Sequence, residues 1–429
     1  MNTEIYWWKD AKIYELYIDK FAGNLKGLTE RLEYFTLLGI NCLHLLPHFP
    51  SPMIDDGYDI IDYRGVRAEL GTLEDFRELI VQAHARGIRI IIDFVLNHTS
   101  NQHPWFREAR SSHKNPKRDF YLWRDAARGF EGATNAFPDI KESNWIYNTQ
   151  TQDYYFATFY PEQPDLNWDN RGVQRAMLAH MDFWAAMGVD GFRLDAAPYL
   201  IKREDTASKG LPEAHGILKH IRRHLEKKYP HVILLAEAHQ NITLTKEYFG
   251  EGDECHMAYH FPLMEVMWLT LVDGDASRVE KMIEDSFDIP VNCQWAVFLR
   301  NHDEISLGTL SPEDRARLVD FLDPRSEYLF KKARATSMRI ASIFDGNCEK
   351  IAQALKLLYS IPGAPIMYYG DEIGMRNLPR VDGILDTRKY VRGVFDWQEA
   401  KRQIKDPASL FNQVAEISRR VVSTALPNV

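Results

Sequence analysis

Short apolar runs alternate along this chain with amphipathic segments in which apolar residues recur at helical spacing. This alternation is typical of parallel strands joined by crossover helices. It predicts eight strands, at 11–18, 40–47, 88–98, 189–196, 232–239, 256–261, 294–301 and 364–372. The main helices are expected at 28–39, 72–87, 170–188, 215–230 and 407–426. The sequence therefore predicts an α/β fold, a (β/α)8 barrel.

Residue types at the ends of the expected helices support these assignments. Thr72, with Asp75 three residues on, matches the capping-box pattern at the start of the 72–87 helix. Gly87 and Gly39 follow apolar-periodic segments, where a glycine commonly ends a helix.

The alternation breaks between residues 99 and 168. This segment is rich in Trp, Tyr, Asn, Pro and Lys and contains no long amphipathic stretch. Long connections of this kind in a compact domain commonly carry function. We therefore expect a barrel formed by 1–98 and 169–429, with an inserted subdomain at 99–168.

Composition and charge narrow the class of protein. The chain has 429 residues, of which 45% are hydrophobic and 26% charged, as in a globular enzyme. Its net charge of −9 argues against a nucleic-acid partner, since binding a phosphate backbone needs a basic face. No apolar run is long enough for a membrane helix, and the N-terminus lacks the zones of a secretory signal. We expect a cytoplasmic protein with no membrane partner; the oligomeric state stays open.

Three apolar runs each end in a carboxylate, at Asp195, Glu237 and Asp303. Because the carboxyl ends of barrel strands meet at one face, we expect these acids to converge over one pocket. Paired carboxylates suit chemistry at a glycosidic bond. No HxH or HExxH spacing is present, which disfavours a metal-dependent hydrolase, and we expect no cofactor.

Four segments carry a resemblance to a known family. DFVLNH (93–98), GFRLDA (191–196), AEAH (236–239) and RNHDE (300–304) resemble, in order, the signature segments of the α-amylase family, glycoside hydrolase family 13. DDGYDIIDY (55–63) and YYGDEIGM (368–375) are similar to its trehalose synthase and oligosaccharide α-glucosidase branch. The resemblance implies a retaining enzyme that acts on short α-glucosides through a covalent glucosyl-enzyme, as an α-glucosidase, a transglucosidase or a trehalose synthase-like isomerase.

The resemblance also implies the roles of the acids. Asp195 resembles the nucleophile, Glu237 the general acid/base and Asp303 the transition-state stabiliser. Arg193, two residues before Asp195 on the same strand face, would keep the nucleophile ionised. Glu237 must carry a proton, which nearby anions and partial burial favour. In a retaining enzyme the two reacting carboxyl groups lie about 5 to 5.5 Å apart.

Further residues resemble those that bind the terminal glucose. His98 and His302 look like the pair that hydrogen-bonds sugar hydroxyls, and Tyr58 looks like the stacking platform. Asp55 and Arg392 look like the ion pair that closes this subsite. A closed end makes a pocket rather than an open groove, which favours the removal or transfer of one terminal glucose.

The chain departs from the family at its calcium positions. The loop at 19–27 is short and has few oxygen ligands. At a second position the family uses residues like Asn97 and Asp165, and trehalose synthases add a glutamate where this chain has Lys202. Calcium needs several oxygen ligands, and an ammonium would take its place, so we predict no structural calcium and no metal site.

Two questions stay open in the sequence. The chain stops after the eighth helix, where relatives continue into a β-sandwich, so we expect that C-terminal domain to be absent. The linkage and the acceptor, whether water, phosphate or a sugar, are not fixed. A sugar phosphorylase of the same family and a non-catalytic barrel scaffold are the alternatives.

Overall fold

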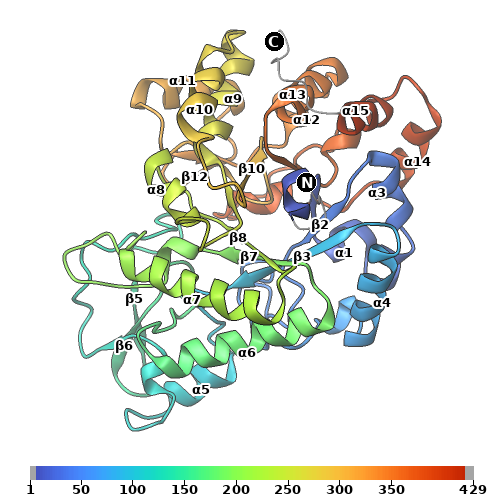
Figure 1. The fold of residues 1–429 in the computed structure, drawn as a ribbon. Helices are drawn as coiled ribbons and strands as arrows, with labels where there is room; N and C mark the ends of the chain where they lie inside the picture. The colour runs from blue at the N-terminus through green and yellow to red at the C-terminus, as the bar shows by residue number, and fades with distance from the viewer. Residues whose placement is uncertain (1–5, 421–429) are drawn as a thin grey trace.

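A closed barrel of eight parallel strands forms the centre of the computed structural model, which describes residues 6–420 (Figure 1). The strands are β1 (Ile13–Leu16), β2 (Cys42–Leu45), β3 (Arg89–Val95), β7 (Gly191–Asp195), β8 (Ile233–Ala236), β9 (Met257–Tyr259), β10 (Gln294–Phe298) and β14 (Ala364–Tyr368). They follow one another around the barrel in this order, and β14 pairs with β1 to close it. The predicted (β/α)8 barrel is confirmed, and each strand lies within its predicted range.

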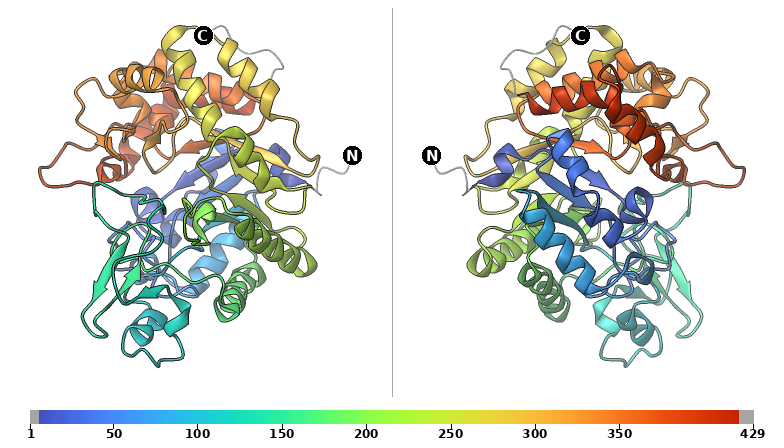
Figure 2. Two further views of the ribbon diagram at one scale, coloured as in Figure 1. Left: turned by 90° about the vertical axis from the view of Figure 1, so that its left-hand side faces the viewer. Right: turned by 90° about the vertical axis from the view of Figure 1, so that its right-hand side faces the viewer.

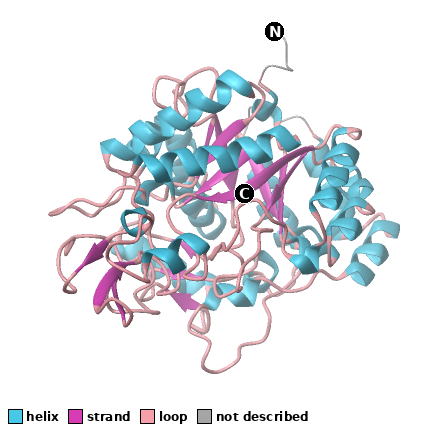
Figure 3. Cartoon of the chain, turned by 90° about the horizontal axis from the view of Figure 1, so that it is seen from below, coloured by secondary structure: helices cyan, strands magenta, loops and turns pink. Residues whose placement is uncertain are grey.

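Helices surround the barrel strands, which are buried almost along their whole length (Figure 3). Burial on both faces explains why the strands read as continuous apolar runs. The helices are α1 (Ile18–Ala22), α2 (Leu25–Thr29), α3 (Leu32–Leu38), α4 (Leu73–His84), α5 (Pro104–Ala109), α6 (Arg171–Met187), α7 (Pro212–Lys228), α8 (Ile242–Lys246), α9 (Phe261–Asp273), α10 (Ser277–Ser286), α11 (Pro312–Leu322), α12 (Ile340–Ile343), α13 (Cys348–Ser360), α14 (Trp397–Lys405) and α15 (Leu410–Arg419). Across residues 6–420, none of them is both long and apolar enough to cross a membrane.

The prediction of one helix over 28–39 is wrong, because α2 ends at Thr29 and α3 begins at Leu32. The guanidinium of Arg31 donates to the carbonyl of Gly27 at 2.7 Å. The backbone amide of Arg31 donates to the carbonyl of Leu28. The backbone at Glu30 and Arg31 therefore forms a turn between the two helices.

The other helix predictions hold with small shifts at their ends. α4 has the predicted capping box and ends at His84, three residues before Gly87. α15 covers the central part of the helix predicted at 407–426, whose last residues, 421–426, lie outside the described residues.

Two small antiparallel sheets lie outside the barrel. The first, in the segment between β3 and α6, consists of β4 (Trp123–Arg124), β6 (Asp153–Phe156) and β5 (Trp145–Asn148). Figure 2 shows this segment, in teal, below the barrel. The second follows β10, was not predicted, and consists of β11 (Ile305–Ser306), β13 (Ala335–Thr336) and β12 (Leu329–Phe330). The division of the chain into a barrel of 1–98 and 169–429 and a subdomain of 99–168 stays a prediction.

The 99–168 segment packs against the second sheet. Phe137, Tyr160 and Phe330 form a small buried apolar cluster, in which the rings of Phe137 and Phe330 lie 5.6 Å apart. This contact joins segments almost 200 residues apart in the sequence, on the side of the barrel where the strands end.

We predict that replacing Thr72 with Ala lowers the free energy of unfolding by about 1 kcal/mol, because the first turn of α4 loses its cap. In the structure the Thr72 hydroxyl accepts from the Asp75 amide at 3.2 Å, and the Asp75 carboxylate accepts from the Thr72 amide at 2.9 Å. Urea unfolding measures the change. Thr72→Ser keeps the hydroxyl and is the matched control; equal losses in both variants would contradict the role of the cap.

Candidate active site

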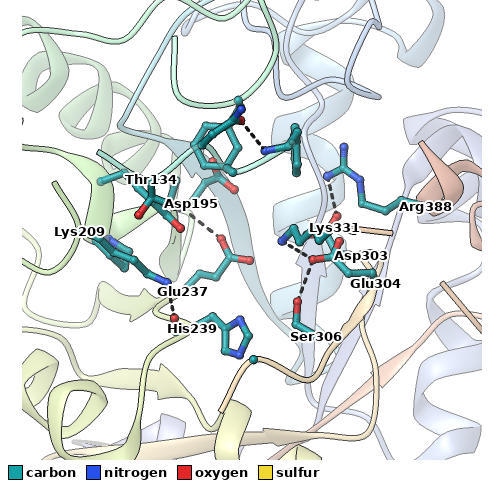
Figure 4. Close-up of a pocket in the computed structure, with 18 of the residues that line it drawn as sticks. Thr134, Asp195, Lys209, Glu237, His239, Asp303, Glu304, Ser306, Lys331 and Arg388 are labelled. Carbon is teal, nitrogen blue, oxygen red and sulfur yellow. Dashed lines mark hydrogen bonds and ion pairs between the residues drawn. The ribbon is translucent and has the colours of Figure 1, made fainter. Parts of the chain in front are cut away.

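A pocket of about 550 Å³ lies at the carboxyl ends of the barrel strands (Figure 4). Its wall combines strand ends with residues of the 99–168 segment and of the second small sheet. Six of the nine predicted site residues line it: Asp55, Tyr58, His98, Asp195, Glu237 and Asp303. The other three, Arg193, His302 and Arg392, are buried and contact these residues.

The barrel strands position the three acids. Asp195 is the last residue of β7, Glu237 follows β8 directly, and Asp303 lies in the loop after β10. Between the first two, the amide of Ala196 donates to the Glu237 carboxylate at 3.2 Å. The expectation that the three strand-end acids converge on one pocket is therefore confirmed; their catalytic roles stay predictions.

Arg193 joins the acids beneath the pocket. It is fully buried on β7, and its register partner on the neighbouring β3 is Asp93. One guanidinium nitrogen lies 2.9 Å from Asp93 and 2.6 Å from Asp195, and another lies 2.5 Å from Glu237. Burial raises the pKa of Asp195, and the charge of Arg193 acts against this rise.

A ring of five buried side chains supports this cluster. His44 lies 3.1 Å from Glu15 and 3.3 Å from Asp93, and His302 lies 2.9 Å from Glu15. Tyr58 closes the ring, since its hydroxyl donates to Asp93 at 2.9 Å and lies 2.6 Å from His302. Every member therefore has two polar partners in a buried region, which fixes the position of Tyr58 in the pocket wall and of His302 behind it.

Sequence reasoning missed Glu15 and His44. Both lie on strands that were predicted, and they are register partners on β1 and β2. The available signal was a charged or polar residue inside an otherwise apolar strand, which must find a partner when it is buried.

Asp303 is held as an anion by its neighbours. His302 lies 3.2 Å from its carboxylate, Arg392 2.7 Å and Arg388 3.1 Å. Burial alone would raise the pKa of Asp303, but these three groups hold it well below its usual range. A permanent negative charge at this place can complement positive charge that develops on a substrate.

The predicted ion pair between Asp55 and Arg392 is wrong. Asp55 pairs with Arg388 at 2.7 Å, whereas Arg392 pairs with Asp56 and Asp303. Arg388 is the second residue of a short 3-10 turn (Thr387–Val391), and Arg392 follows its last residue, so the path of that turn decides which of them faces Asp55.

Arg388 lines the pocket beside Asp55. Asp386 anchors its guanidinium at 2.7 Å, and Gln163 donates to the other oxygen of Asp55 at 2.9 Å. Burial raises the pKa of Asp55 to about 6, with Arg388 and Arg392 acting in the opposite direction. Arg388 therefore takes the place beside Asp55 that the prediction gave to Arg392, and the closure of the glucose subsite by this pair stays a prediction.

Lys202 occupies the position between Asn97 and Asp165, as expected for an ammonium that replaces a metal ion. Its nitrogen lies 2.7 Å from Asp165 and 3.0 Å from Asn97, and it also donates to the carbonyl of Tyr199. Asn97 precedes the pocket residue His98, so this buried contact supports the pocket wall directly.

Several pocket residues gave no recognisable signal in the sequence. They come from irregular segments without periodicity; they are Phe137, Phe159, Lys209, Lys331, Lys332 and Arg334. Such positions become visible only when the fold brings the segments together.

Comparisons with known proteins agree with this geometry. The family model "Alpha amylase, catalytic domain" matches residues 7–331. A trehalose synthase of Pimelobacter sp. (strain R48) is 42% identical over 397 residues, which covers 87% of this chain and 68% of the relative. A trehalose synthase of Thermus thermophilus is 42% identical over 401 residues, which covers 92% of this chain and 41% of that protein.

More distant similarities point the same way. The oligo-1,6-glucosidase of Heyndrickxia coagulans is 31% identical over 404 residues, with 86% of this chain and 67% of the relative covered. A crystal structure of an alpha-glucosyl transfer enzyme, XgtA, superposes with a TM-score of 0.74 at 26% identity, covering 95% of this chain and 83% of that one. A variant of the isomaltulose synthase of Erwinia rhapontici NX5, solved with sucrose, gives a TM-score of 0.76 at 25% identity, with 96% and 83% covered.

Replacing Lys202 with Met should lower the free energy of unfolding by about 3 to 5 kcal/mol, because the buried carboxylate of Asp165 loses its cation. Thermal and urea unfolding measure the loss. The double variant Lys202→Met/Asp165→Asn removes the unpaired charge and should regain part of the stability. A single variant as stable as the original protein would refute this role of Lys202.

His98 should make the stability depend on pH, because burial lowers its pKa to about 4. The unfolded chain binds a proton at this residue below about pH 6.5, and the folded protein does so only near pH 4. Its contribution is therefore fully present above pH 6.5 and is lost as the pH falls, up to about 3 kcal/mol at pH 4.

Urea unfolding between pH 7 and pH 4 tests this expectation. His98→Gln should flatten the dependence relative to the original protein, whereas His220→Gln, at an exposed position, should leave it as it was. The same pH dependence in all three proteins would contradict the assignment.

Proposed function

This chain belongs to the α-amylase family of glycoside hydrolases and transglucosidases, and on that basis we propose that it transfers terminal glucosyl groups of short α-glucosides through a covalent glucosyl-enzyme. It is an α-glucoside-active enzyme, in line with its trehalose synthase relatives. The observation that carries the finer proposal is the convergence of Asp195, Glu237 and Asp303 in one pocket, whose wall also contains the ion pair of Asp55 and Arg388.

In the proposed reaction Asp195 attacks the anomeric carbon while Glu237 gives its proton to the glycosidic oxygen, so the bond to the leaving group breaks as the bond to Asp195 forms. The hydroxyl of an acceptor then returns a proton to Glu237 and forms the new bond, which releases Asp195. Asp303 stabilises the positive charge on the sugar ring in both steps. The contact of Arg193 with Asp195 supports the assignment of the nucleophile, because a neighbouring cation favours the ionised carboxylate.

The terminal glucose would lie against the closed end of the pocket. His98 and His302 would hydrogen-bond its hydroxyls, and Tyr58 would support its ring. Tyr58 is itself stacked on His302, with ring centroids 5.4 Å apart and planes 10° from parallel, so both groups are preorganised. The closed end favours the transfer of one terminal residue over cleavage inside a polymer.

Hydrolysis, transglucosylation and trehalose synthase-like isomerisation share these steps and differ only in the acceptor. Exclusion of water favours transfer over hydrolysis. The contact of Phe137 with Phe330, which joins the 99–168 segment to the second small sheet beside the pocket, supports a covered site.

Incubation with maltose, trehalose, sucrose and isomaltose, with and without phosphate, should give turnover of at least one of them. Free glucose would identify a hydrolase, a new disaccharide a transglucosidase or isomerase, and glucose 1-phosphate a phosphorylase. Product chromatography makes the distinction. No turnover of any α-glucoside, including phosphorylated ones, would refute the proposed function.

Asp195→Ala should reduce this turnover by at least about 10⁴-fold, as expected when a nucleophile is removed, with the fold retained. Asp320→Ala, which changes an exposed carboxylate on α11, is the matched control and should behave like the original protein. Turnover close to the original rate in Asp195→Ala would overturn the assignment of the nucleophile.

A further inference from the structure

Positive charge gathers on one part of the pocket wall. Lys209, Lys331, Lys332 and Arg334 all line the pocket. Within the described part of the chain, only Lys331 pairs with a carboxylate, that of Glu304. The remaining three cations have no acidic partner, although five carboxylates line the same pocket.

Lys209 is the most enclosed of these unpaired cations. Its ammonium donates to the carbonyl of His239 at 2.7 Å, which leaves two of its three hydrogens without an acceptor among the described residues. Burial lowers the pKa of Lys209 to about 8, and the nearby charge of Lys331 adds to this effect. In Figure 4 the carboxylate of Glu237 lies between the ammonium groups of Lys209 and Lys331.

Lys332 and Arg334 bring further charge to the pocket mouth, where both are exposed. The chain reaches this position through Lys331, Lys332 and Ala333, whose φ angles of 52°, 53° and 60° are rare for residues other than glycine. The amide of Lys332 donates to the carboxylate of Asp139 in the 99–168 segment, which holds the turn in place. Unfavourable backbone conformations of this kind are kept mainly where they position groups for binding.

The cations of the pocket thus differ in how they are paired. Arg388 is matched by Asp55, Asp386 and Asp303. Lys209 instead reaches the carbonyl of His239, two residues after Glu237, the residue that would give its proton to the leaving group. A partly buried ammonium without a carboxylate partner is unfavourable unless an anion joins it, and a neutral sugar supplies no anion.

We propose that the leaving group or acceptor of this enzyme carries an anionic group, a phosphate or a carboxylate, which Lys209, Lys332 and Arg334 bind. The proposal rests on the proposed function only for the position of the glucosyl group at the closed end. Lys331 is excluded from this set because Glu304 already neutralises it.

Calorimetric titration of the original protein at low ionic strength measures ligand binding, so it tests the proposal independently of catalysis. The ligands are glucose, glucose 6-phosphate, glucuronate and inorganic phosphate. We expect at least one of the three anions to bind at least tenfold more tightly than glucose, and added salt to weaken that binding. Equal or weaker binding of all three anions would overturn the proposal.

The three anions also distinguish the sources of the charge. Tightest binding of glucose 6-phosphate or glucuronate supports a substituent on a sugar, whereas tightest binding of inorganic phosphate supports the free ion as the acceptor. Loss of α-glucoside turnover is a separate readout, since it would contradict the proposed function and leave the titration result in place.

Charge-neutral variants localise the site. In Lys332→Gln and Arg334→Gln, both at exposed positions that should not affect folding, the ratio of anion affinity to glucose affinity should fall at least threefold, and in Lys209→Met it should fall further. Lys401→Gln on α14, also exposed, is the matched control and should leave this ratio as it is. If none of the three pocket variants changes the ratio, the assignment of these residues is wrong.

Discussion

The buried guanidinium of Arg193 is the group on which the rest of the site depends. It contacts Asp93, Asp195 and Glu237 from a position without solvent exposure. A buried charge is tolerated only when it is paired, and the removal of one partner leaves the others uncompensated. A one-residue slip of β7 would turn Arg193 to the opposite face of the sheet and leave the three carboxylates without their shared cation. The charge balance of the site therefore depends on the register of the barrel strands.

The loops add shape and selectivity to this rigid floor. Arg388 pairs with Asp55 in the pocket wall, and the contact between Phe137 and Phe330 joins two distant segments beside the opening. The result is a pocket in which carboxylates match Arg388, whereas Lys209, Lys332 and Arg334 form no ion pair among the described residues. The first property suits a terminal glucosyl group, and the second would select what that group is transferred from or to.

The sequence predicted the barrel and its acids well because both leave periodic or positional signals. Strands buried on two faces read as apolar runs, and an acid at the end of such a run must lie at the barrel rim. The choice between Arg388 and Arg392 left no such signal, since both lie in one segment and the path of a single turn decides their partners. The turn at Glu30 and Arg31 that separates α2 from α3 left no such signal either, and the lysines of the pocket come from irregular loops.

The most direct test of the account is to trap the covalent intermediate with a fluorinated α-glucosyl fluoride, which forms the glucosyl-enzyme readily and releases it slowly. Mass spectrometry of the digested protein then locates the sugar. The account predicts one glucosyl group per chain, on the peptide that contains Asp195, and none in Asp195→Ala. A label on Glu237 or Asp303, or turnover of the reagent without any trapped sugar, would contradict it.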